Sequence, residues 1–134
     1  HVIGSAGEDT LYADITGSRL EGRAGDDQIF GNAGNDTIDG GANDDIVVGG
    51  AGDDTFIFGL ANGNDRIFDN FEGAGAAGGD VIDLSAYGLN AATLATLMSD
   101  DGVHTDIDLT GHGGGTIEVL GVGLDAAGDD FTLA

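Results

Sequence analysis

The sequence predicts an all-β fold in which short parallel strands stack into two facing sheets. Three observations predict it: a nine-residue repeat that begins at Gly4, an apolar residue at the eighth position of every block, and glycine in most of the turns between. The repeat runs through six blocks to Ile57 without an insertion. Two blocks would make one full turn, so odd blocks should stack on one side and even blocks on the other.

The eighth position of each block is predicted to point into the core. In block order it holds Leu11, Leu20, Ile29, Ile38, Val47 and Phe56. The last three residues of each block are rich in β-branched and aromatic types, which favours a short strand with alternating side chains. Glycines in the first part of each block can adopt positive φ and let stacked chains approach closely, so this part is expected to turn.

The sixth position of each block is the candidate ligand position. In block order it holds Asp9, Ser18, Asp27, Asp36, Asp45 and Asp54. Stacked strands lie about 4.8 Å apart, and oxygen ligands hold Ca²⁺ at roughly 2.4 Å. Carboxylate and carbonyl oxygens of two successive turns can therefore grip one ion. The expected bridging pairs are Asp9 with Asp27, Asp27 with Asp45, and Asp36 with Asp54.

The charge of the chain indicates that folding needs a cation. It has 25 Asp and Glu against 3 Lys and Arg, a net charge of −22, yet its apolar fraction is 40%. One inward side chain per block does not offset the entropy of ordering nine residues. The metal-free chain is therefore expected to be unfolded or loose, with metal binding supplying folding free energy. A flexible acidic linker, the alternative, gives no reason for the apolar eighth position.

The same composition excludes several classes of partner. Arg19, Arg23 and Arg66 are too few for nucleic-acid binding, and no polybasic or long apolar membrane anchor is present. The absence of cysteine excludes disulfides, thiolate nucleophiles and Cys-ligated zinc. The first residues lack the pattern of a signal peptide, which leaves a cytosolic chain, a fragment, or export by a route that reads another signal.

The block at residues 49–57, GGAGDDTFI, matches every specified position of the nonapeptide G-G-x-G-x-D-x-U-x. The repeats thus resemble the repeats-in-toxin (RTX) family. The resemblance implies a right-handed parallel β-roll, a calcium-filled solenoid holding several Ca²⁺ ions, within a larger secreted bacterial protein that leaves by type I secretion. Family members include haemolysins, serralysin-type proteases, lipases and mannuronan epimerases. The metal-binding residues it implies are Gly7, Asp9, Gly22, Gly25, Asp27, Gly31, Gly34, Asp36, Gly40, Asp45, Gly49, Gly52 and Asp54.

Two regions depart from the repeat. The second block has Ser18 where the aspartate belongs and lacks the leading glycine, so the site between blocks two and four is expected to be empty or weak. After Ile57 the register slips, and residues 49–85 resemble the end of a serralysin-type β-roll. A less regular calcium site is expected there at Asp65, Asp80 or Asp83; ordinary surface aspartates in loops are the alternative.

The rest of the chain is predicted to cap the stack. Asn90 is a good N-cap for a short helix over 91–98. Apolar and polar residues alternate over 103–109 and 116–120, which predicts a hairpin around a glycine turn. Residues 72–79 are predicted to form a flexible loop. The predicted units are the β-roll at 4–57, its irregular last turns at 58–89, and a C-terminal cap at 90–134. The acidic and apolar end, 126–134, fits a type I secretion signal or a final capping strand.

These observations favour a secreted module that folds on calcium over an enzyme. No catalytic residue is predicted, and any catalysis would lie elsewhere in a parent protein. A polysaccharide-binding accessory module is the alternative function. A small metalloenzyme at His104, Asp106 and Asp108, which share one face of a predicted strand, ranks last because exposed alternation produces the same pattern.

Overall fold

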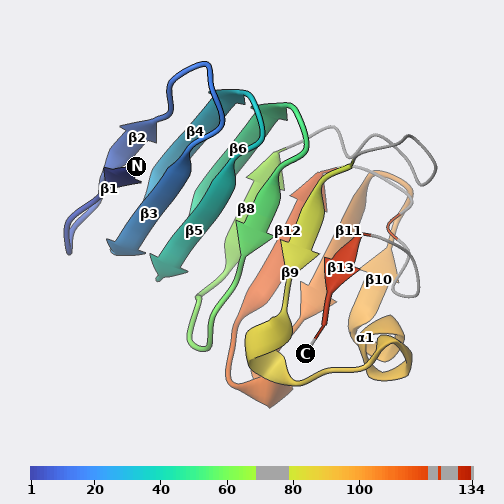
Figure 1. Ribbon diagram of the computed structural model, residues 1–134. Coiled ribbons are helices and arrows are strands. Elements are labelled where there is room, and N and C mark those ends of the chain that lie inside the picture. The colour runs from blue at the N-terminus through green and yellow to red at the C-terminus, as the bar shows by residue number, and fades with distance from the viewer. Residues whose placement is uncertain (69–78, 121–123, 125–129, 134) are drawn as a thin grey trace.

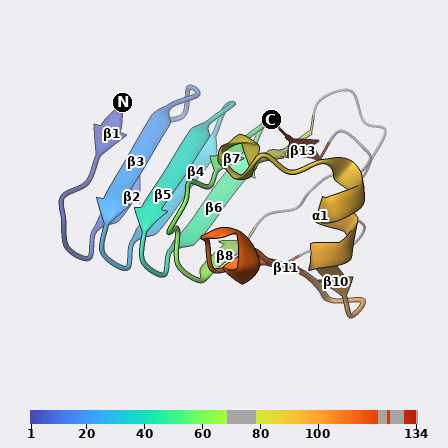
Figure 2. The same ribbon diagram turned by 90° about the horizontal axis from the view of Figure 1, so that it is seen from below.

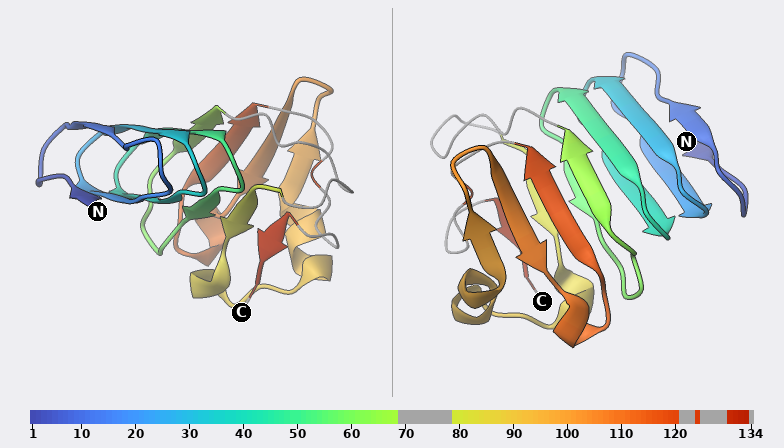
Figure 3. Two further views of the ribbon diagram at one scale, coloured as in Figure 1. Left: turned by 45° about the horizontal axis from the view of Figure 1, so that its top comes forward. Right: turned by 180° about the vertical axis from the view of Figure 1, so that it is seen from behind.

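The computed structural model describes residues 1–68, 79–120, 124 and 130–133. Its strands form two sheets that face each other across a flattened coil (Figures 1 and 3). The first sheet has the order β1-β3-β5-β7-β9-β13. Its strands are β1 (Val2–Ile3), β3 (Arg19–Ala24), β5 (Thr37–Ala42), β7 (Thr55–Ile57), β9 (Val81–Asp83) and β13 (Phe131–Thr132).

The second sheet has the order β10-β11-β12-β8-β6-β4-β2. Its strands are β2 (Thr10–Tyr12), β4 (Gln28–Ala33), β6 (Ile46–Ala51), β8 (Asp65–Phe68), β10 (Met98–Asp100), β11 (His104–Asp108) and β12 (Thr116–Leu120). Strands β2, β4 and β6 come from odd blocks, whereas β3, β5 and β7 come from even blocks. The predicted sorting of blocks between two sheets of parallel strands is confirmed.

The core is a row of inward side chains from each sheet. Leu20, Ile38, Phe56 and Ile82 are in register across the first sheet, and Leu11, Ile29, Val47 and Ile67 are in register across the second. All eight are buried. The apolar eighth position therefore faces the interior in every block, as predicted, because alternation along each strand sends its neighbours outward.

The strands β3 to β6 are longer than predicted, because each continues through the third residue of the following block. The expected turn at the start of a block is instead a local kink within a strand. The second residue of the block has positive φ even where it is not glycine, at Arg23 (85°) and Asn32 (71°). The chain reverses at positions four and five, where Gly25 and Gly34 have positive φ.

The predicted hairpin and helix are both present. β11 and β12 pair antiparallel, and β12 pairs parallel with β8, so the hairpin extends the second sheet at its C-terminal end. The helix α1 (Ala91–Leu97) is capped by the Asn90 side chain, which accepts a hydrogen bond from the Thr93 amide. It lies at that same end of the stack, beside β10 (Figure 2).

Two short 3₁₀ helices, η1 (Ser85–Tyr87) and η2 (Thr110–His112), complete the cap. The predicted loop at 72–79 lies outside the described residues except for Gly79, and the tail at 126–134 is described only at 130–133. Within that tail, β13 pairs parallel with β9, as a capping strand would. No helix in the described part of the chain is long and apolar enough to cross a membrane.

Candidate calcium-binding turns

The aspartates of the sixth position form a buried column along each side of the roll. On the side of the second sheet, the Asp9 amide donates to Asp27 Oδ1 (2.8 Å), the Asp27 amide to Asp45 Oδ1 (2.9 Å), and the Asp45 amide to Asp65 Oδ1 (2.9 Å). Each carboxylate thus receives the N–H of the equivalent residue one full turn earlier. The predicted pairs of Asp9 with Asp27 and of Asp27 with Asp45 are neighbours in this column.

The column on the side of the first sheet follows the same rule. The amides of Ser18, Asp36 and Asp54 donate to Oδ1 of Asp36 (2.5 Å), Asp54 (2.8 Å) and Asp80 (2.9 Å). Ser18 therefore keeps its place in the column through its backbone but contributes no carboxylate. Asp65 and Asp80, which follow the break in the repeat, continue the two columns although their spacing along the chain has changed.

The second oxygen of four of these carboxylates has no partner within the described residues. These oxygens are Oδ2 of Asp27, Asp36, Asp45 and Asp54, and all four are buried. A buried charge without a partner is strongly unfavourable, so such groups are paired with donors, cations or metal ions. These four oxygens fit a bound cation.

The glycine at the first position makes room for them. A Cβ on Gly22 would lie 2.3 Å from Asp27 Oδ2 and 2.3 Å from the Gly40 carbonyl oxygen. A Cβ on Gly31 would lie 2.6 Å from Asp36 Oδ2 and 2.4 Å from the Gly49 carbonyl oxygen. A carboxylate oxygen and a carbonyl oxygen of the adjacent turn therefore converge at the place that a side chain would otherwise occupy. Oxygens of these two kinds are the ligands that Ca²⁺ prefers.

The glycines of the fourth position serve close stacking. A Cβ on Gly25, Gly34 or Gly52 would meet backbone atoms of the preceding turn at 2.2 to 2.5 Å, and all three have positive φ. A Cβ on Gly7, at the open end, would meet nothing within 4 Å. Among the described residues, no group of three or more His, Cys, Asp or Glu side chains could hold a metal. A cation in these turns would therefore need backbone carbonyl ligands as well as carboxylates.

Burial shifts the protonation of the column. Burial, together with the neighbouring carboxylates of Asp65 and Asp27, raises the pKa of Asp45 to about 7. Burial likewise raises the pKa of Asp54 to about 6 and that of Asp65 to about 7. The metal-free column therefore holds protons that a bound cation would displace, because calcium binds the ionised form.

Both ends of the second-sheet column are closed by protein donors, which sequence analysis missed. Asp9 Oδ2 accepts hydrogen bonds from the Ser5 amide (2.6 Å) and hydroxyl (2.9 Å). Asp65 Oδ2 accepts one from Asn62 Nδ2 (2.6 Å). The available signal was a polar side chain three or four residues before the aspartate, which is common in any loop. Asp83 lies outside the columns, on β9, and its carboxylate accepts from the Ser85 amide.

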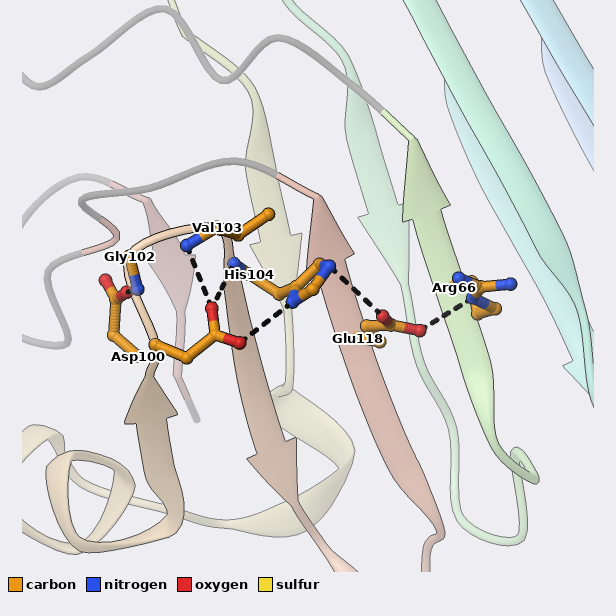
Figure 4. A network of polar contacts seen from close by, with 7 residues as sticks. Arg66, Asp100, Gly102, Val103, His104 and Glu118 are labelled. Carbon is orange, nitrogen blue, oxygen red and sulfur yellow. Dashed lines mark hydrogen bonds and ion pairs between the residues drawn. The ribbon is translucent and has the colours of Figure 1, made fainter.

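Two residues of the metalloenzyme hypothesis, His104 and Asp108, are engaged in contacts with other side chains and backbone groups. His104 Nδ1 lies 3.2 Å from an oxygen of Asp101, and Nε2 lies 3.8 Å from Glu118, which also pairs with Arg66 at 2.6 Å (Figure 4). The Asp108 carboxylate accepts from the Thr110 amide and hydroxyl. The network crosses β11, β12 and β8, so it joins the cap to the roll on the exposed face of the sheet.

Comparisons with known proteins agree with this geometry. The model of the RTX calcium-binding nonapeptide repeat matches in 4 copies, at residues 1–15 and 20–56. The unmatched gap contains Ser18, where the second block departs from the pattern. No curated protein sequence matches the chain.

Solved structures match over nearly the whole chain. The AlgE6R3 subunit of the Azotobacter vinelandii mannuronan C5-epimerase is 32% identical, with a TM-score of 0.64, over 96% of this chain and 80% of its own. The AlgE6R2 subunit is 30% identical, with a TM-score of 0.73, over 99% and 92%. The extracellular lipase LipA from Serratia marcescens is 26% identical, with a TM-score of 0.70, over 98% of this chain but 20% of the lipase.

These neighbours come from enzymes, whereas the repeat match shows a calcium-binding module in this chain. Several Ca²⁺ ions bind across such repeats. The nonapeptide register, the paired aspartate columns and these matches together show that the chain belongs to the family of RTX calcium-binding nonapeptide repeats.

Proposed function

We propose that this chain folds when Ca²⁺ binds after secretion, and that it stabilises and helps to export a larger secreted bacterial protein. The observation that carries the proposal is the set of four buried carboxylate oxygens without a partner in the described residues. In the absence of a cation these oxygens oppose folding, whereas a bound divalent ion converts them into stabilising contacts. Extracellular calcium modules bind with dissociation constants of about 10⁻⁴ to 10⁻³ M, which separates a calcium-poor cytoplasm from the medium.

The ions would be held by the sixth-position carboxylates together with backbone carbonyls of the stacked turns. Asp27, Asp45, Asp36 and Asp54 supply the unpartnered oxygens. The first-position glycines contribute space and, at Gly40 and Gly49, the carbonyl oxygens that face the neighbouring turn. The turn of the second block, with Ser18, contributes no carboxylate and is the weakest part of this arrangement.

Far-UV circular dichroism during a Ca²⁺ titration tests the proposal, with Mg²⁺ as the control ion. Calcium should produce a cooperative change from coil to β structure, with a midpoint near 10⁻⁴ to 10⁻³ M. Magnesium should not, because it requires shorter, near-octahedral contacts and dehydrates reluctantly. A β spectrum that is unchanged by EGTA would show that the core and cap suffice without metal.

The export role has its own test. A reporter fused to this chain should appear in the medium of cells that carry a type I exporter, and should remain inside when the exporter is deleted. The matched fusion with residues 126–134 removed asks whether the acidic and apolar end is the signal. Equal export of both fusions would assign the signal to another part of the chain.

Polysaccharide binding is a second candidate, favoured by the likeness to subunits of a mannuronan C5-epimerase. The outer face of the second sheet offers an exposed ring: Tyr12 is 62% exposed and stacks on Phe30 with ring centroids 5.0 Å apart. Arg19 and Arg66 are already paired with carboxylates. A neutral glycan, or an anionic one bridged by calcium, therefore fits better than direct binding of an anionic chain.

Affinity gel electrophoresis in gels that contain a glycan, with and without EGTA, separates the two functions. Retardation that Tyr12→Ala reduces and Ile15→Ala leaves intact would support glycan binding, since Ile15 is also exposed (74%) but has no ring. Equal mobility in gels with and without glycan, across neutral and anionic polysaccharides, would leave only the folding function.

A further inference from the structure

Asn62 is a buried amide whose polar atoms are all used at the C-terminal end of the second-sheet column. The residue is 1% exposed. Its Nδ2 donates to Asp65 Oδ2 (2.6 Å), and its Oδ1 accepts from the Gly115 amide (3.3 Å) and faces the Tyr87 hydroxyl. The orientation of the amide is fixed by the Gly115 N–H, which can only donate and therefore requires the Asn62 oxygen on its side and the Asn62 nitrogen on the side of Asp65.

The oxygen that Asn62 contacts is the counterpart of the unpartnered oxygens in the central turns. Asp45 and Asp65 occupy the same position of successive turns, and Oδ1 of each accepts an amide from the turn before. They differ at Oδ2, which is buried without a partner in Asp45 and hydrogen-bonded to Asn62 in Asp65. The Asn62 side-chain amide therefore occupies, at Asp65, the position in which a cation would contact Oδ2 of Asp45 in the central turns.

The turn that follows has the backbone of a repeat but no carboxylate. Strand β12 stacks on β8 in parallel, and Ile117 is in register with Asp65, so an apolar residue occupies the position that aspartate holds in earlier turns. The Ala61 amide donates to the Gly113 carbonyl (2.7 Å). A Cβ on Gly114 would lie 2.6 Å from Asn62 Oδ1, so glycine allows this turn to reach the amide.

We propose that the Asn62 turn is a metal-free closing turn, in which the amide takes the place of a calcium ion at Asp65 and ends the second-sheet column of ions where the cap begins. The inference deepens the proposed function and rests on it. A cation can join oxygens of two turns, whereas one amide satisfies a single carboxylate oxygen with its N–H and uses its carbonyl to hold the cap. Replacing the amide with a carboxylate should therefore open a further site.

Native mass spectrometry of the calcium-loaded chain counts the ions directly and tests the proposal. Asn62→Asp should bind one ion more than the wild type, because two facing buried carboxylates need a cation between them. Asn43→Asp is the matched control: it adds the same charge at an exposed position of the neighbouring turn and should leave the count unchanged. An Asn62→Asp chain that keeps its β spectrum and the wild-type count would overturn the proposal.

A second pair of variants tests the same point if Asn62→Asp does not fold. Asp45→Asn should lose an ion, whereas Asp65→Asn should keep the wild-type count, although it loses the hydrogen bond to Asn62. Loss of an ion from Asp65→Asn would show that calcium binds at the closing turn and would refute the proposal. A wild-type chain that binds no calcium would instead remove the proposed function itself, so the two failures are distinguishable.

Discussion

Replacing Ile38 with alanine should raise the calcium concentration needed for folding, although Ile38 is a core residue and not a candidate ligand. Ile38 is 1% exposed and lies in register between Leu20 and Phe56 at the centre of the first sheet. Truncating a buried isoleucine to alanine costs about 2–5 kcal/mol, depending on how far the surrounding side chains relax. In the proposed function, folding and calcium binding form one equilibrium. The lost stability therefore raises the calcium concentration at the midpoint of the folding titration.

The size of the shift follows from the number of ions that share the loss. If one ion binds at each of the four unpartnered carboxylate oxygens, each contributes RT times the logarithm of the calcium concentration. A loss of about 2–5 kcal/mol spread over four ions raises the midpoint about 2- to 8-fold. A single-ion equilibrium would instead shift about 30-fold or more for the same loss.

Circular dichroism at increasing Ca²⁺ measures this midpoint. Ile15→Ala is the matched control, since Ile15 is 74% exposed and exposed substitutions usually change stability by less than about 0.5 kcal/mol. Its midpoint should stay at the wild-type value. Equal midpoints for Ile38→Ala and Ile15→Ala would refute the coupling between core and calcium.

Three further predictions concern the turns. Asp45→Asn should lower the number of calcium ions bound per chain by one in isothermal titration calorimetry, whereas Asp26→Asn, on the exposed side of the same stack, should leave that number unchanged. Gly22→Ala should cost about 1–3 kcal/mol in denaturant titrations at saturating calcium, because its Cβ would lie 2.3 Å from two oxygens; Gly7→Ala, with open space, should be neutral. In EGTA, the β signal should grow as the pH falls from 8 to 5: burial raises the pKa of Asp45 and Asp65 to about 7, so the folded chain binds more protons than the unfolded chain in that range. In calcium titrations, the midpoint concentration should rise as the pH falls, because protons compete with calcium for these carboxylates. A midpoint that does not depend on pH would contradict the assignment of these carboxylates as ligands.

The core could be predicted from sequence because the nine-residue period fixes which side chain of each block points inward. Leu20 and Ile29 both hold the eighth position, and because their blocks are even and odd they are assigned to opposite sheets. The length of the strands could not be predicted in this way. Arg23 and Asn32 adopt positive φ within a strand, and non-glycine residues rarely do so, so the glycines of neighbouring blocks wrongly indicated a turn at that point.

The aspartate columns were predictable for the same reason as the core, but the roles of the two carboxylate oxygens were not. Oδ1 of Asp27 binds an amide that lies 18 residues earlier in the chain, and only the stacking of turns brings the two groups together. Of the three aspartates expected to bind calcium after the break, Asp65 and Asp80 continue the columns, whereas Asp83 lies on a strand and accepts a hydrogen bond from the Ser85 amide. A Gly-x-Asp pattern ends at Asp65 and at Asp80, whereas Val81 and Ile82 precede Asp83.

A column of buried aspartates thus has two physical solutions, and they have different consequences for the stack. A calcium ion takes oxygens from adjacent turns, so a turn that binds one favours another aspartate in the turn that follows. An amide neutralises no charge and satisfies one oxygen with its N–H, so the next turn needs no carboxylate and can carry an apolar residue such as Ile117 in its place. Counting sixth-position aspartates therefore overestimates the ions bound by any column that ends in a protein donor. The feature that distinguishes the two kinds of turn is a hydrogen bond from a protein donor, such as Ser5 or Asn62, to the second carboxylate oxygen.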